Sequence, residues 1–433
     1  MDEKEYLQTL GEQIVNPHAR ASVLAEIQDH IEEQAQDYRA SGMSEAVAMQ
    51  EAVRQMGDPV STGEALNQVH RPKFPIALFG LAVVLTVLGI AMQYLVYTHL
   101  TPDTAILSDT YLQRTILYNA IGLGLLLLCI FGNYMYLAKG TWILLAIFLL
   151  GLLPPWFFGF YSRQYTLCYY LALVYPLVYA LLLYRLRDKG AKAIWFLHGL
   201  TLLFLVRMLF GTIITWSTVL AAGCLTLLLL CLAIHRGILT GSSKRTLWLL
   251  TVLPYVAAAA CFVILFFQNS YMRDRLTEFL KGSGYVQQML ALEQQQMLAF
   301  GGGTISSYVD TESLASTYVL HSIFLWFGIV SGILVIVALA VLVLRSLHYA
   351  LHQSNRLALL AGTAASGILL FELLHFVLTN FGCSPVYTAS VPFLSYGFAN
   401  SVFNSLLVGI TLGVIRNQNV LSETTASLRG LRA

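Results

Sequence analysis

Ten long apolar segments occupy most of this 433-residue chain beyond its first 73 residues. Several approach the roughly 20 residues that an α-helix needs to cross a bilayer. Hydrocarbon offers no water to backbone groups, so each such segment must satisfy its own hydrogen bonds as a helix. Only 11% of the residues are charged, against about 25% in soluble proteins. The pattern predicts an all-α polytopic membrane protein with spans at 74–97, 115–136, 141–157, 167–184, 194–210, 212–234, 246–268, 318–344, 357–379 and 398–415.

Residues 1–70 have a different pattern. They are polar, and apolar residues such as Leu10 and Ile14 recur at three- and four-residue spacing. This spacing predicts a bundle of three or four helices ahead of a membrane domain at 74–416 and a tail at 417–433. Because the bundle contains no catalytic constellation, we expect docking to a cytoplasmic partner or regulation, and not chemistry. The acidic residues of its first half are typical of a solvated face.

Basic residues are concentrated on the side of the membrane that holds both ends of the chain. An even number of spans puts the two ends on one side, and the excess of lysine and arginine marks that side as cytoplasmic. The segment 269–317 is then the one large outer loop. A structureless connection of this length is less common than a functional one.

The outer loop contains two features suited to a phosphorylated ligand. Arg273 and Arg275 could hold a phosphate through charge-assisted hydrogen bonds. The three glycines at 301–303 permit close approach of the backbone to a ligand. Ordinary surface charge on an exposed loop is the alternative.

A third feature precedes the last span, where the run 391–397 reads Val-Pro-Phe-Leu-Ser-Tyr-Gly. Proline breaks the helical ladder, and serine and tyrosine bring polar groups to membrane depth. Such backbone survives only where it is buried in protein or lines a polar cavity. The sequence therefore predicts a functional element here.

Together these features resemble the SEDS family (shape, elongation, division and sporulation), which includes the FtsW, RodA and SpoVE proteins. The family has ten spans, cytoplasmic termini and a large outer loop between spans seven and eight. Its loop pattern is matched by Arg273 to Phe279, by Gly284-Tyr285-Val286-Gln287 and by the glycines at 301–303. Its LPFxSYGGSSxxxN pattern is matched by the 391–397 run and Asn404. Separately, residues 1–70 resemble the permease-prefix helical domain that precedes membrane proteins in Firmicutes.

The resemblance implies polymerisation of lipid II, or a related undecaprenyl-linked precursor, into peptidoglycan outside a bacterial plasma membrane. An acidic residue would act as general base, and basic residues with a divalent cation (Mg²⁺ or Mn²⁺) would stabilise the leaving diphosphate. No tightly bound cofactor, metal site or nucleic-acid partner is expected. A class B penicillin-binding protein, a transpeptidase, is the implied partner in cell division or cell shape.

One departure from the family bears directly on catalysis. The family's aspartate before span eight falls at Thr317, which has no carboxylate. Asp310 and Glu312 are the candidates for a displaced acid. The alternatives are a catalytically degenerate relative that binds precursor or scaffolds a cell-wall complex, and a translocase for lipid-linked precursor.

Ionisable residues inside the spans complete the candidate set. Glu372 and His375 lie on one face of span nine and form either a functional pair facing a cavity or a buried pair that satisfies itself. Arg207 in span five could serve a lipid headgroup or support a site from a second shell, but extension to the outer interface is the favoured expectation. His321 could be a ligand or base near the outer mouth, but a lone histidine there is more often structural. The predicted substrate-binding residues are Arg273, Arg275, Tyr285, Gly301, Gly302, Gly303, Glu372, His375, Pro392, Ser395, Tyr396, Gly397 and Asn404.

Overall fold

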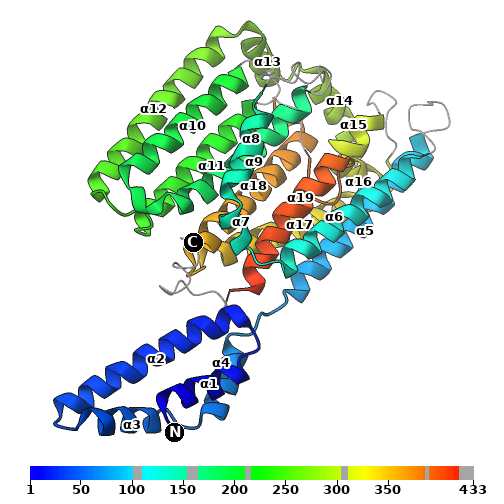
Figure 1. Ribbon diagram of the computed structural model, residues 1–433. Coiled ribbons are helices and arrows are strands. Elements are labelled where there is room, and N and C mark those ends of the chain that lie inside the picture. The colour runs from blue at the N-terminus through cyan, green and yellow to red at the C-terminus, as the bar shows by residue number, and fades with distance from the viewer. Residues whose placement is uncertain (101–109, 154–163, 210–215, 304–310, 386–389, 419–433) are drawn as a thin grey trace. The chain divides into compact units, whose positions relative to one another are not determined.

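The computed structural model describes the chain except for residues 101–109, 154–163, 210–215, 304–310, 386–389 and 419–433 (Figure 1). The described residues form helices and connecting turns. The chain divides into two compact units, one consisting mainly of residues 1–75 and the other mainly of residues 76–413. We call them the head and the membrane unit and describe each by itself.

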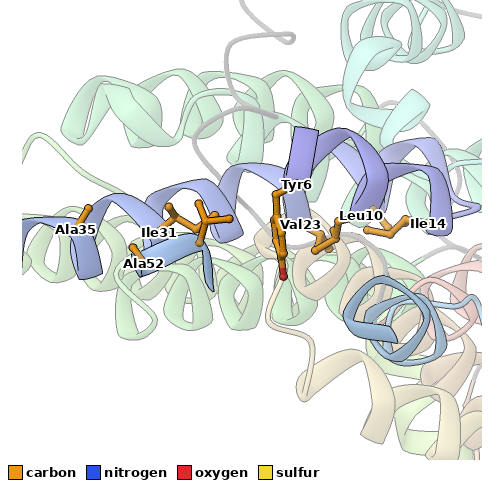
Figure 2. Close-up of a cluster of buried hydrophobic side chains, with 9 residues drawn as sticks. Tyr6, Leu10, Ile14, Val23, Ile31, Ala35 and Ala52 are labelled. Atoms are coloured by element: carbon orange, nitrogen blue, oxygen red, sulfur yellow. The ribbon is translucent and has the colours of Figure 1, made fainter. Parts of the chain in front are cut away.

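The head is a four-helix bundle, which confirms the expected helical domain. Its core gathers Tyr6, Leu10, Val23 and Ile31, all of them buried (Figure 2). The Tyr6 hydroxyl donates to the carbonyl of Met56, at a distance of 3.1 Å. The helices are α1 (Glu3–Gln13), α2 (Pro17–Ala40), α3 (Glu45–Gln55) and α4 (Pro59–Val69).

The membrane unit contains, among the described residues, nine helices long and apolar enough to cross a bilayer. These helices confirm the predicted polytopic class. They are α5 (Ile76–Leu100), α6 (Tyr111–Phe131), α9 (Gln164–Arg185), α10 (Ala191–Leu209), α11 (Trp216–His235), α12 (Lys244–Gln268), α17 (Ile329–Leu351), α18 (Arg356–Asn380) and α19 (Phe398–Arg416).

The third predicted span, 141–157, differs from these helices. Its described part is the 11-residue helix α8 (Thr141–Gly151), which follows the short helix α7 (Met135–Lys139). The rest of that span lies largely outside the described residues.

The predicted start of the eighth span at residue 318 is wrong. Gly328 separates α16 (Val319–Phe327) from α17 and has φ +90°. A Cβ at this position would lie 2.5 Å from the carbonyl oxygen of Ala299, so only glycine fits there. The described part of the sequence between Asn269 and the start of α17 is therefore mainly helical, not one loop. It contains α13 (Ser270–Lys281), α14 (Tyr285–Gln294), α15 (Thr311–Ser316) and α16.

Burial differs sharply among the spans. In α9 and α18, 78% of the most apolar 18-residue window is buried inside the protein, against 6% in α12. Figure 1 shows α12 at the edge of the membrane unit, with α9 and α18 in its interior. The two interior helices carry Tyr169, which is half-buried, and Glu372, which is buried.

Candidate functional site

The 391–397 run satisfies its own irregular backbone. The Ser395 hydroxyl accepts a hydrogen bond from the Val391 N–H at 3.1 Å. The Asn400 side chain, at the start of α19, donates to the Ser395 carbonyl at 2.8 Å. Phe393 has φ +69° and is the one non-glycine residue with positive φ in the described chain. Polar residues of the run and of α19 thus replace the helical ladder that the proline interrupts.

The same run is fixed to α15. Ser395 donates its hydroxyl hydrogen to the carbonyl of Ser316 at 2.7 Å, and the Tyr396 N–H donates to the carbonyl of Ala315 at 3.0 Å. Gln93 of α5 donates from its amide nitrogen to the carbonyls of Ala315 and Leu394, both at 2.8 Å. These bonds join three segments that are far apart in sequence. We call this arrangement the α15 clamp.

Thr317 follows the clamp directly. Its carbonyl accepts a hydrogen bond of 2.9 Å from the side-chain amide of Asn380, at the end of α18. Oδ1 of the same Asn380 side chain accepts from the His321 N–H, also at 2.9 Å. One amide of α18 therefore holds the backbone on both sides of the turn that begins at Thr317, and the Thr317 residue is half-buried. This is the position at which the resemblance implies a catalytic aspartate.

The two displaced-acid candidates lie just before Thr317. Asp310 is outside the described residues. The backbone of Glu312 belongs to α15, the helix that the clamp holds. The clamp thus fixes the backbone from which a carboxylate at 312 extends.

The other predicted substrate-binding residues of the outer region do not gather at one place. Some are exposed, and others pack against the protein itself. Arg273 is exposed, whereas Arg275 is half-buried and donates from Nε to the carbonyl of Pro385 at 3.3 Å. Tyr285 is 64% exposed. The glycines at 301–303 approach the protein's own chain, because the Gly303 N–H donates to the Leu325 carbonyl at 2.9 Å. Close backbone approach therefore occurs there, with the end of α16 as the neighbour.

Glu372 lies in a buried polar cluster between α9, α18 and α19. Its Oε1 atom accepts hydrogen bonds from the hydroxyls of Ser390 at 3.3 Å and Tyr169 at 3.5 Å. Asn404 lies beside the carboxyl group, but its amide nitrogen donates to Asn400 at 2.6 Å. Consequently Oε2 of Glu372 and Oδ1 of Asn404 have no donor among the described residues. His375, also buried, stacks its ring on Phe371 with 5.4 Å between centroids.

Two other ionisable candidates are buried. Arg207 does not extend to the surface, since it is only 8% exposed. That expectation is wrong, and the reason is that the last turn of α10 presents this side chain toward Cys168 of α9. His321 forms a buried contact with Glu293 of α14, with 2.7 Å between Nε2 and Oε2. This contact joins α14 to α16.

Sequence reasoning missed Gln93, Asn380, Tyr169 and Glu293. Gln93 could have been identified from the sequence, because it is an amide in an otherwise apolar span. Glu293 could not have been identified in this way, since it lies in a glutamine-rich polar stretch. No group of three or more His, Cys, Asp or Glu side chains suited to a metal gathers within the described ranges.

The two units of the chain match different known proteins. The HAAS family matches residues 5–61. A chain from a peptidoglycan synthase complex, described as coordinating polymerization and crosslinking, is 18% identical, with a TM-score of 0.57. The match covers 80% of this chain and 98% of that one.

A second solved structure is that of a point mutant of the rod shape determining protein RodA from Thermus thermophilus. It is 17% identical over 80% of this chain and 98% of its own, with a TM-score of 0.46. No protein of curated function matches the chain. Residues 5–61 therefore match the HAAS family, and the rest of the chain shares the fold of the chain from the peptidoglycan synthase complex.

Proposed function

We propose that this protein acts in peptidoglycan assembly at the outer face of the bacterial plasma membrane. It engages lipid II, or a related undecaprenyl-linked precursor, at residues 310–317. The observation that carries the proposal is the α15 clamp, which uses Gln93 and Ser395 to hold the segment where the resemblance implies the acid. The fold shared with a chain of a peptidoglycan synthase complex supports it.

In the catalytic form of this proposal, the reaction is glycosyl transfer to a sugar hydroxyl. Asp310 or Glu312 takes the proton from that hydroxyl, and Arg273 stabilises the leaving diphosphate from the surface of α13. Exposure of Arg273 leaves its guanidinium accessible to a ligand. A class B penicillin-binding protein would then crosslink the strands, since the related complex coordinates polymerization with crosslinking.

A second candidate is a precursor-binding relative without polymerase activity. Thr317 favours it, because a hydroxyl at this fixed position cannot serve as the carboxylate base. Both candidates require the same binding site, so binding is tested first.

The test is binding of fluorescent lipid II to the purified full-length protein. Ser395→Ala removes one hydrogen bond of the clamp and one within the 391–397 run, each worth about 1 kcal/mol, and should weaken binding at least about fivefold. Ser331→Ala is the matched control, because its hydroxyl bonds only to the Phe327 carbonyl within an exposed turn. Absence of lipid II binding to the unmodified protein would refute the proposal.

A further inference from the structure

We infer that His348 and His352, at the end of α17, form a binding site for one divalent transition-metal ion of the group Cu²⁺, Ni²⁺ and Zn²⁺. The inference is independent of the proposed function. The sequence contains ten histidines, and these are the two that stand four residues apart. Residues with this spacing lie on one face of a helix, one turn from each other. In zinc proteases, two histidines four apart on a helix bind the same metal ion.

The two imidazole rings are already close together. Their centroids are 4.3 Å apart, and their planes are inclined by 38°. A metal–nitrogen bond of about 2.1 Å would place the ion roughly 3.2 Å from each ring centroid. Centroids 4.3 Å apart then subtend an angle of about 85° at the ion, close to the right angle between neighbouring ligands in a square-planar site. Cu²⁺ and Ni²⁺ prefer that geometry, and a small rotation of one ring would widen the angle for Zn²⁺.

A backbone hydrogen bond prepares His352 as a ligand. Its Nδ1 atom lies 2.8 Å from the carbonyl oxygen of His348. Because a carbonyl only accepts, Nδ1 carries the hydrogen, and Nε2 of the neutral ring keeps its lone pair. Metal-binding histidines commonly donate their other ring N–H to a carbonyl in this way, which fixes the orientation of the ring.

Solvent can reach both rings. His348 and His352 are exposed, and they lie at the C-terminal end of a 23-residue span, where the chain reaches the membrane interface. The carbonyl end of a helix carries partial negative charge, which favours a bound cation. Two guanidinium groups oppose this effect, since Arg345 lies one turn before His348 and Arg236 donates to the Leu351 carbonyl at 3.1 Å. We therefore expect a site of moderate affinity.

The two imidazoles also select the class of metal ion. Imidazole suits Cu²⁺, Ni²⁺ and Zn²⁺, whereas Mg²⁺ prefers carboxylate and water oxygens. The site therefore differs in chemistry from the divalent cation implied for glycosyl transfer. No third His, Cys, Asp or Glu joins the pair in the part of the chain that the structure describes, so water would fill the other coordination positions. A bound ion would link the last turn of α17 and stabilise it.

The experiment measures Cu²⁺ binding to the untagged, full-length protein in detergent. The protein is first treated with EDTA, its exposed cysteines are alkylated, and both reagents are removed. We expect one Cu²⁺ ion per chain at the site of highest affinity, with couplings to two imidazole nitrogens in its electron paramagnetic resonance spectrum. Zn²⁺ should displace Cu²⁺ and raise the melting temperature, whereas Mg²⁺ should do neither.

Two variants remove one ligand each. His348→Ala and His352→Asn should weaken Cu²⁺ binding at least about tenfold, a loss that is usual even for an outer-shell partner of a metal ligand. Asparagine retains a donor at the end of α17 and is tolerated at helix C-termini. Both side chains are exposed, so the metal-free variants should melt at the temperature of the unmodified protein. His235→Ala is the matched control, since His235 is exposed at the end of α11 and has no histidine four residues away.

The inference is overturned if the unmodified protein binds no Cu²⁺, or if its spectrum shows fewer than two imidazole nitrogens. It is also overturned if only one of the two ligand variants loses affinity, because a single imidazole would then account for the binding. Equal losses in His235→Ala and the ligand variants would contradict it as well. The spectrum of the unmodified protein keeps the test decisive if a variant does not fold.

Discussion

At the scale of single residues, three polar side chains from distant parts of the chain hold α15 and the turn after it. Gln93, Asn380 and Ser395 each bond to a carbonyl of α15 or of the turn after it. In hydrocarbon an unsatisfied carbonyl is costly, so these contacts make irregular backbone tolerable there. Glu372 is different, because its own second oxygen has no donor in the described chain. A hydrogen between this oxygen and Oδ1 of Asn404 would satisfy both atoms.

Glutamine at position 372 would provide such a hydrogen. Glu372→Gln keeps an acceptor for Tyr169 and Ser390 and adds an N–H that can donate to Asn404. We expect its melting temperature to equal or exceed that of the unmodified protein. Glu372→Ala removes the acceptor and should lower the free energy of unfolding by about 1–3 kcal/mol. A glutamine variant as unstable as the alanine variant would show that the negative charge itself is required.

At the scale of elements, glycines set two close contacts that shape the outer region. Gly328 allows α16 to end and α17 to begin at one residue. Gly89 allows α5 to approach the 391–397 run, because a Cβ there would lie only 2.0 Å from the Phe393 carbonyl oxygen. Since α5 also carries Gln93, the close contact at Gly89 places the side-chain amide of Gln93 within the clamp.

A substitution at Gly89 therefore tests the clamp through packing. Gly89→Ala forces backbone apart and should lower the free energy of unfolding by about 1–3 kcal/mol, the usual effect of overpacking. Because the shift also moves Gln93, lipid II binding should fall with stability. Gly80→Ala on the same helix has no atom within 4 Å of its Cβ and should be neutral or stabilising. Equal melting temperatures for the two variants would argue against the close contact.

At the scale of the whole molecule, hydropathy predicted the spans well and their interruptions poorly. A run such as 318–344 is continuously apolar, so the break at Gly328 follows from a tertiary contact with Ala299 and not from composition. The clamp could not be predicted from the sequence either, because Gln93 and Ala315 are 222 residues apart. The 391–397 run could be identified because a proline and polar residues contradict a lipid-facing helix. The contact of this run with α15 could not be predicted from the sequence.

The topology of the whole chain can be tested with a native cysteine. Cys383 is exposed just after α18, whereas the other five cysteines lie within spans. With both termini cytoplasmic, a membrane-impermeant maleimide should label Cys383 in intact spheroplasts. Cys383→Ser should abolish the labelling. Labelling that appears only after permeabilisation would reverse the proposed orientation.

The most direct test of the central claim is polymerisation of labelled lipid II by the purified protein, with Mn²⁺ or Mg²⁺ and a cognate transpeptidase. If residues 310–317 contain the reacting centre, the unmodified protein forms glycan strands. The double variant Asp310→Ala/Glu312→Ala then loses at least about 100-fold in rate, the usual worth of a general base. Adding Thr317→Asp to the double variant restores strand formation. A double variant as active as the unmodified protein would contradict the claim, and so would the absence of strands from both the unmodified protein and the triple variant.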